Sequence, residues 1–240
     1  MICLDRFDKL KEIQLKLMAI EMIKSLKEHF TYEELSKILN INESILCRYV
    51  RGDILPSLSQ SQYIANSLRN SKFIRDFIFK KVKVYEDGFV DLSEIYEDPS
   101  ILKVTVYLLF SIIPQEFNKI LTPSVNGLPF AILFSQITRS KIIISKKYMD
   151  SRYIQYTDEI IEERNALITK MYIRKDSIRK GDKILIIDDV MRTGKTLSTL
   201  VSLVNKQKGI VVGAGLIVCL GNEWKRVLPD NFKVFTLIKM

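Results

Sequence analysis

Two adjacent carboxylates, Asp188 and Asp189, follow an apolar run in the segment ILIIDDVMRTGKT, which covers Ile184 to Thr196. The segment ends in a loop, TGKT, whose backbone N–H groups and threonine hydroxyls can bind a phosphate at the positive end of a following helix. Ionised carboxylates only accept hydrogen bonds, so they suit sugar hydroxyls or Mg²⁺ rather than phosphate. A ribose 5-phosphate meets both requirements, with its phosphate in the loop and its 2′ and 3′ hydroxyls on the carboxylates.

Two alternatives compete for this segment. The letters GKT at Gly194 to Thr196 also occur in ATP-binding P-loops, but that motif needs a glycine where this chain has Asp189, whose charge would repel a phosphate. A purely structural strand and turn is the other alternative, and two aspartates at a strand end are costly without a ligand or partner. The sequence therefore favours a sugar phosphate site.

The elements that position this segment are read from the alternation of apolar runs and helical patterns after residue 100. Apolar runs such as Ile184 to Ile187 suit parallel strands buried on both faces. The alternation predicts a doubly wound α/β sheet that binds ligands at the carboxyl ends of its strands. Strands are expected at Lys119 to Pro123, Lys141 to Lys146, Lys183 to Val190, Val211 to Leu220 and Phe232 to Lys239, with helices near Ser100 to Ile113, Pro129 to Ile137 and Thr196 to Lys206.

The segment ILIIDDVMRTGKT resembles the phosphoribosyl pyrophosphate (PRPP) signature of type I phosphoribosyltransferases, and the resemblance extends over roughly residues 100 to 240. It implies an α/β fold of that type, with a parallel sheet and flanking helices. It also implies Mg²⁺ held with PRPP at the two aspartates rather than by the protein alone, and, in an enzyme, catalytic roles for Asp188, Asp189 and Lys146. The ligand contacts that the resemblance implies come from three segments: Asp188, Asp189, Val190, Met191, Arg192, Thr193, Gly194, Lys195 and Thr196; Ser124, Val125, Asn126 and Gly127 in LTPSVNGLPFAI; and Lys146 or Lys147 after IIIS.

Tyr148 to Ile173 would then form a hood over the base, with contacts from Tyr148, Arg152, Tyr153 and Tyr156, while Trp224 either stacks on a base or packs at the surface. Two departures from the family weaken the case for catalysis. The loop between Thr122 and Pro129 carries no charge, and Arg192 stands where the family has a small residue. Because the family's catalysis depends on electrostatic stabilisation of pyrophosphate departure, losing a charge can leave binding intact and chemistry poor.

Two short helices are expected near the N-terminus. Thr31 and Glu34 form a capping box for a helix that ends at Asn40, and Asn42 can cap a second helix that Gly52 ends. The stretch ELSKILNINESILCRYVRG, residues 34 to 52, resembles the helix-turn-helix of phage-repressor-type regulators.

The exposed face of the second helix can enter a DNA major groove, where Arg donates two hydrogen bonds to a guanine edge. An ordinary helical hairpin is the alternative. The DNA contacts expected from the resemblance are Lys37, Ser44, Arg48, Tyr49 and Arg51.

Composition bounds the partners and the compartment. The net charge of +9 suggests a polyanionic or phosphorylated partner, although a generally basic proteome explains it equally well. Cys3, Cys47 and Cys219 are far apart, which indicates neither disulfides nor a zinc site and fits a reducing cytoplasm. The chain shows no signal-peptide pattern and no run approaching the ~18 apolar residues of a membrane span.

Turn residues and acidic side chains between Tyr85 and Pro99 place a domain boundary near residue 88. We therefore expect an all-α helix-turn-helix domain over residues 1–88 and a phosphoribosyltransferase-like ligand-binding domain over residues 89–240. This build resembles that of regulators of bacterial purine operons and of archaeal regulators. It implies a homodimeric transcription regulator that binds double-stranded DNA and senses PRPP or a purine nucleotide, with no membrane partner and no required cofactor. The alternative is an active phosphoribosyltransferase, for a purine base or orotate, whose helical domain only mediates dimerisation.

Overall fold

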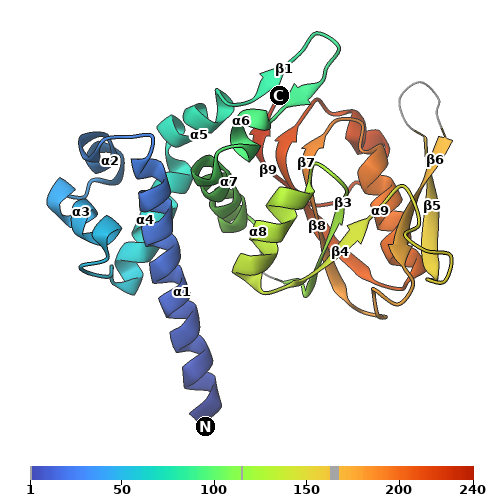
Figure 1. The fold of residues 1–240 in the computed structure, drawn as a ribbon, viewed down its shortest axis with the longest axis horizontal. Coiled ribbons are helices and arrows are strands. Elements are labelled where there is room, and N and C mark those ends of the chain that lie inside the picture. The colour runs from blue at the N-terminus through green and yellow to red at the C-terminus, as the bar shows by residue number, and fades with distance from the viewer. Residues whose placement is uncertain (1, 115, 163–167) are drawn as a thin grey trace. The chain divides into compact units, whose positions relative to one another are not determined.

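The computed structural model describes residues 2–114, 116–162 and 168–240 of the chain (Figure 1). It contains two compact units, Met1–Ser111 and Ile112–Met240. Within the described residues, no helix is long and apolar enough to cross a membrane.

The first unit opens with five helices and continues into a short hairpin and two further helices. Leu35, Leu39, Leu46, Ile64 and Leu68 are each fully buried, so the amphipathic helices share one apolar core. The elements are α1 (Ile2–Lys27), α2 (Tyr32–Leu39), α3 (Glu43–Arg51), α4 (Leu58–Asn70), α5 (Lys72–Phe79), β1 (Lys83–Val84), β2 (Val90–Asp91), α6 (Ser93–Tyr96) and α7 (Pro99–Ile112).

The predicted caps of α2 and α3 are confirmed. The Glu34 N–H donates to Thr31 Oγ1 at 3.2 Å, and the Thr31 N–H donates to Glu34 Oε2 at 2.7 Å. Asn40 takes the left-handed conformation with φ of 50°, and Asn42 Oδ1 accepts the Ser44 N–H at 3.0 Å. Local hydrogen bonding therefore fixes the two helix ends and the turn between them, independently of what the pair binds.

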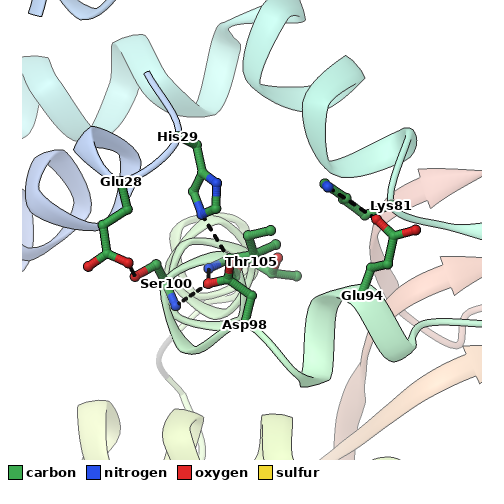
Figure 2. A network of polar contacts seen from close by, with 8 residues as sticks. Glu28, His29, Lys81, Glu94, Asp98, Ser100 and Thr105 are labelled. Carbon is green, nitrogen blue, oxygen red and sulfur yellow. Dashed lines mark hydrogen bonds and ion pairs between the residues drawn. The ribbon is translucent and has the colours of Figure 1, made fainter. Parts of the chain in front are cut away.

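A polar network ties the end of α1 to the start of α7 (Figure 2). The Ser100 hydroxyl donates to Glu28 Oε2 at 2.6 Å, and His29 Nε2 lies 3.2 Å from Asp98 Oδ2. Asp98 Oδ1 also accepts the Ser100 N–H at 2.8 Å, which satisfies a free donor at the start of α7. These contacts join the start of α7 to the first unit. The division by compactness falls between Ser111 and Ile112, and the domain boundary near residue 88 stays a prediction.

The second unit is built on a parallel sheet of five strands in the order β4-β3-β7-β8-β9. Observed strand and helix ends lie within two residues of the expected ones. The elements are β3 (Lys119–Pro123), α8 (Leu128–Thr138), β4 (Lys141–Ser145), β7 (Lys183–Met191), α9 (Lys195–Lys206), β8 (Ile210–Cys219), the short 3-10 helix η2 (Glu223–Arg226) and β9 (Val234–Lys239). The α/β prediction with a central parallel sheet is confirmed. A separate antiparallel hairpin, β5 (Tyr156–Glu162) with β6 (Ile168–Arg174), was not expected.

The strand order reverses between β3 and β7. The chain moves from β3 through α8 to β4 in one direction and from β7 through α9 to β8 in the other. Because such crossovers are right-handed, the two helices lie on opposite sides of the strands, as Figure 1 shows. Loops after β3 and β7 diverge at this switch point, where open α/β sheets form their ligand crevice.

At the other end of β3, an ion pair joins Lys119 to the turn before β7. Lys119 Nζ lies 2.6 Å from Asp182 Oδ2, and the two side chains are 13% and 12% exposed. Asp182 also accepts the Arg179 N–H at 2.7 Å and the Asn118 amide at 2.9 Å. Together with Lys119, these donors lower the pKa of Asp182 from 3.8 to about 2. The pair therefore fixes the amino ends of the two strands that flank the switch point.

Replacing Asp182 with Asn should lower the free energy of unfolding at pH 7 by about 3 kcal/mol, because it leaves the Lys119 ammonium nearly buried without its counter-charge. A carboxyl whose folded pKa is depressed stabilises the fold above its unfolded pKa, and this contribution is lost as pH falls from 3.8 toward about 2. The difference from wild type should thus shrink over that interval. Urea unfolding followed by circular dichroism at pH 7 and pH 2.5 measures it, with the exposed Asp230→Asn as control. An equal deficit at both pH values would refute the assignment.

Candidate functional site

The expected carboxylates stand at the end of β7. Residues 184 to 189 of this strand are all buried, and Asp188 and Asp189 are only 6% and 8% exposed. Asp188 Oδ1 accepts the Asp189 N–H at 2.9 Å, and Asp189 Oδ1 accepts the Val190 N–H at 2.8 Å. Burial, reinforced by the charge of Asp189, raises the pKa of Asp188 well above its usual range. A buried acid with a neighbouring like charge is a mark of a functional site, because a cation or hydrogen-bond donors from a ligand would relieve it.

The chain leaves β7 through a tight loop and enters α9 at Lys195. Gly194 precedes the helix with φ of 77°, a conformation that side chains disfavour. The helix has no side-chain cap at its start. Arg192 and Lys195 are exposed, whereas Thr193 and Thr196 are half-buried. The start of α9 thus has the geometry of an anion site. Asp188 and Asp189 lie just before it in the chain, near the end of β7.

The loop Ser124 to Gly127 after β3 meets these acids. A Cβ added to Gly127 would lie 2.9 Å from both Asp188 Oδ1 and Thr122 Oγ1, so only glycine allows this approach. The peptide bond between Ser124 and Val125 is cis, and the Val125 side chain is 74% exposed. Two segments about sixty residues apart in the sequence are thereby brought to one edge of the sheet.

Lys146 and Lys147 follow β4 at the same edge. Lys146 is half-buried and Lys147 is exposed. The Ser124 N–H donates to the carbonyl of Ser145 at 2.9 Å, which places the start of the Ser124 loop beside the residue before Lys146. The Lys146 ammonium pairs with Asp150 Oδ1 at 2.7 Å.

The predicted hood, Tyr148 to Ile173, contains β5 and part of β6, and its residues 163 to 167 lie outside the described residues. Tyr148, Arg152 and Tyr153 are exposed, and Arg152 donates to the Tyr153 hydroxyl at 3.0 Å. The Tyr156 hydroxyl accepts the Asp150 N–H at 3.1 Å. Contacts of these side chains with a base remain a prediction.

Trp224 lies directly behind the loop that leads into α9. A Cβ on Gly194 would lie 2.9 Å from Trp224 Cβ and 3.1 Å from its Cα, so Trp224 forms the wall behind the TGKT loop. Its ring packs against the apolar core of the second unit. Packing was one of the two uses expected for Trp224, and stacking on a base stays a prediction. In the sequence, only Gly194 pointed to a tight turn at this place, and a glycine does not reveal which residue packs behind it.

The residues expected to contact DNA lie on α2 and α3 of the first unit. Ser44, Arg48 and Arg51 are exposed on α3, and Lys37 is exposed on α2 with its ammonium 2.6 Å from Glu33. Tyr49 is an exception, since it is 7% exposed and packs inside the unit. The expectation for Tyr49 is corrected accordingly, because its position on α3 faces the other helices.

A parallel sheet with paired acids and the TGKT loop at its switch point defines an α/β domain of the type expected from the sequence. A family model described as "Phosphoribosyl transferase domain" matches residues 91–240, and the chain belongs to this family. The chain is 24% identical over 159 residues to the purine biosynthesis transcriptional repressor PurR of Bacillus subtilis (strain 168), a match that covers 65% of this chain and 55% of that protein. It is 29% identical over 151 residues to the adenine phosphoribosyltransferase of Kosmotoga olearia, covering 62% of this chain and 88% of that enzyme.

Solved structures share the fold. The adenine phosphoribosyltransferase of Rhodothermus marinus DSM 4252 superposes with a TM-score of 0.65 at 21% identity, over 71% of this chain and 100% of that one. The adenine phosphoribosyltransferase of Thermoanaerobacter pseudethanolicus superposes with a TM-score of 0.64 at 19% identity, over 69% of this chain and 99% of that one.

Replacing Gly194 with Ala should destabilise the second unit more than replacing Gly181. Both glycines have positive φ, at 77° and 85°, so each substitution costs about 1 to 2 kcal/mol in backbone conformation. A Cβ at 181 meets nothing within 4 Å, whereas a Cβ at 194 meets the backbone of Trp224 and should cost about 1 to 3 kcal/mol more. Urea unfolding followed by the fluorescence of Trp224, the only tryptophan, measures both. Equal losses would contradict the wall assigned to Trp224.

Proposed function

We propose that this protein is a ligand-sensing transcription regulator. Its second unit binds PRPP or a purine nucleotide, and its first unit binds double-stranded DNA as part of a homodimer. The observation that carries the ligand half is the convergence of Asp188, Asp189, the Ser124 loop and the start of α9 at the switch point of the sheet. The repressor named PurR, among the relatives, supports the regulatory half.

In the proposed complex, the ligand's 5′-phosphate lies at the start of α9. There it accepts hydrogen bonds from backbone N–H groups of the TGKT loop and is stabilised by the helix dipole. The carboxylates of Asp188 and Asp189 accept hydrogen bonds from the ribose hydroxyls. The same acids fit Mg²⁺ carried by PRPP, since hard cations prefer oxygen ligands and would compensate the two neighbouring negative charges.

In the first unit, α3 is the proposed reading helix. Its exposed side chains Ser44, Arg48 and Arg51 suit base edges and phosphates, and Lys37 on α2 suits a backbone phosphate. Two copies related by a two-fold axis would read half-sites about 34 Å apart. Ligand binding alters DNA affinity only if the ligand distinguishes the DNA-competent state from the incompetent one.

An active phosphoribosyltransferase is the second candidate. Relatives named as adenine, xanthine and hypoxanthine/guanine phosphoribosyltransferases favour it, as does the pair of acids. Against it stand the uncharged Ser124 loop and Arg192 in the TGKT loop. Incubation with PRPP and each of adenine, hypoxanthine, guanine, xanthine and orotate, followed by chromatography of nucleotide products, separates the candidates. Turnover without DNA binding would favour the enzyme.

Replacing both Asp188 and Asp189 with Asn should weaken PRPP binding by at least about 10-fold, because each hydrogen bond to a charged acceptor is worth roughly 1.5 to 3 kcal/mol. The ligand-free protein should nevertheless gain stability at pH 7. Folding raises the pKa of Asp188, and such a carboxyl destabilises the fold once pH exceeds its unfolded pKa. Asn carries no charge and removes this destabilisation. Calorimetric titration and thermal unfolding test the two effects. Unchanged PRPP affinity would remove the acids from the site.

Replacing Arg48 and Arg51 with Ala should abolish specific binding to promoter DNA of the gene's own operon and leave PRPP affinity unchanged. Each bidentate contact to a guanine contributes about 1 to 3 kcal/mol of discrimination. Fluorescence anisotropy at one fixed salt concentration gives the affinities. Arg179→Ala together with Arg226→Ala, both exposed in the second unit, supplies a control that removes the same charge. DNA binding that survives in the α3 variant would exclude α3 as the reading helix.

A further inference from the structure

The side chain of Lys146 is held by an acid of its own chain. Its ammonium lies 2.7 Å from Asp150 Oδ1, and the two side chains are 31% and 33% exposed. This hydrogen bond raises the pKa of Lys146 and lowers that of Asp150, so both groups are charged at neutral pH. The ring of Tyr148 lies 5.5 Å from the same ammonium and adds a cation-π contact.

Asp150 is itself fixed in place. Its backbone N–H donates to the Tyr156 hydroxyl at 3.1 Å, and its Oδ2 lies 3.5 Å from that hydroxyl. Tyr156 begins β5, and its ring meets the Tyr172 ring of β6 edge-on at 6.1 Å. The acid is thus attached to the base of the β5–β6 hairpin and is not a freely rotating surface group.

The backbone of Lys146 is fixed equally well. Its N–H donates to the carbonyl of Tyr172 at 3.0 Å, and the Tyr172 N–H donates to the carbonyl of Lys146 at 2.7 Å. The preceding residue, Ser145, accepts the N–H of Ser124 at 2.9 Å. The backbone of the lysine therefore lies at the edge of the sheet where the Ser124 loop meets Asp188, and its ammonium is already paired with Asp150.

We infer that Lys146, one of the expected ligand contacts, binds the pyrophosphate group of PRPP, and that Asp150 competes with this group for the lysine ammonium and thereby sets how much PRPP is needed to fill the site. This inference rests on the ligand-binding half of the proposed function. PRPP carries a second anionic group, the pyrophosphate on the ribose carbon remote from the 5′-phosphate. A purine nucleoside monophosphate carries an uncharged base at that carbon. Only PRPP must therefore displace Asp150 from the ammonium of Lys146 when it binds.

The exchange has a direction and a limit. A pyrophosphate offers Lys146 more negative charge than one carboxylate does, so it wins when its concentration is sufficient. Exposed ion pairs are worth at most about 1 kcal/mol, which corresponds to a roughly 5-fold change in affinity. Nucleoside monophosphate affinity is independent of the pair. Asp150 thus lowers the affinity for PRPP by a few-fold relative to the affinity for the nucleotide, and it leaves the rest of the ligand site unchanged.

Asp150→Asn tests this, because it removes the charge and keeps the size of the side chain. PRPP with Mg²⁺ and GMP are titrated calorimetrically at one salt concentration against wild type, Asp150→Asn and the control Asp158→Asn. Asp158 is a matched control, since it pairs with Lys170 Nζ at 2.9 Å on the same hairpin. We expect Asp150→Asn to bind PRPP more tightly, by up to about 5-fold, with unchanged GMP affinity, and Asp158→Asn to match wild type.

Lys146→Gln completes the test, because it removes the group for which the anions compete. In this variant PRPP should bind more weakly, and a further Asp150→Asn change should have no effect. Circular dichroism confirms that each variant is folded. Equal or weaker PRPP binding by Asp150→Asn, with wild type binding both ligands, would overturn the inference and leave the ligand site standing. Binding of neither ligand by any variant or by wild type would overturn the proposed function as well.

Discussion

The second unit is organised around two neighbouring carboxylates at the end of a strand that is buried on both faces. Burying Asp188 beside Asp189 costs free energy, and the loops of the surrounding chain meet at these acids. Gly127 lets the Ser124 loop come within contact distance of Asp188. Gly194 adopts the left-handed conformation that the chain needs just before α9. Site and fold are therefore not separable, since the strand pairing that buries the acids also delivers the loops that surround them.

Much of this arrangement could be read from the sequence because its causes are local. The capping box at Thr31, the left-handed Asn40 and the apolar run before Asp188 each carry their own signal, and helix and strand ends follow from them. The β5–β6 hairpin was missed because its strands mix charged and apolar residues without strict alternation, so tertiary pairing decides them. Whether Tyr49 is buried or exposed is also decided by tertiary packing. Its side depends on how the helices of the first unit pack, and α3 alone does not determine it.

Other features depend on residues that are distant in the sequence. Trp224 stands thirty residues after Gly194, yet it forms the wall against which the TGKT loop is shaped. The ion pair of Lys119 with Asp182 likewise joins two segments whose local patterns say nothing of each other. The contacts of Glu28 and His29 with Ser100 and Asp98 also join α1 to α7 across the turn residues and acidic side chains between Tyr85 and Pro99. Composition marks where a chain can turn, but long-range contacts decide where a unit ends.

The pairing of β3 with β7 aligns Lys119 with Ile184, and every residue of the hood lies between these strands in the chain. The Ser124 loop and the acids of β7 do not meet until this distant pairing has formed, and contacts of such large sequence separation form slowly. A ribosome must therefore release most of the chain before these two segments can meet. If the second unit binds PRPP or a purine nucleotide as proposed, that ligand would also stabilise newly made molecules by mass action, because it binds only the folded form. Under that proposal, the supply of the metabolite would influence how many copies survive quality control.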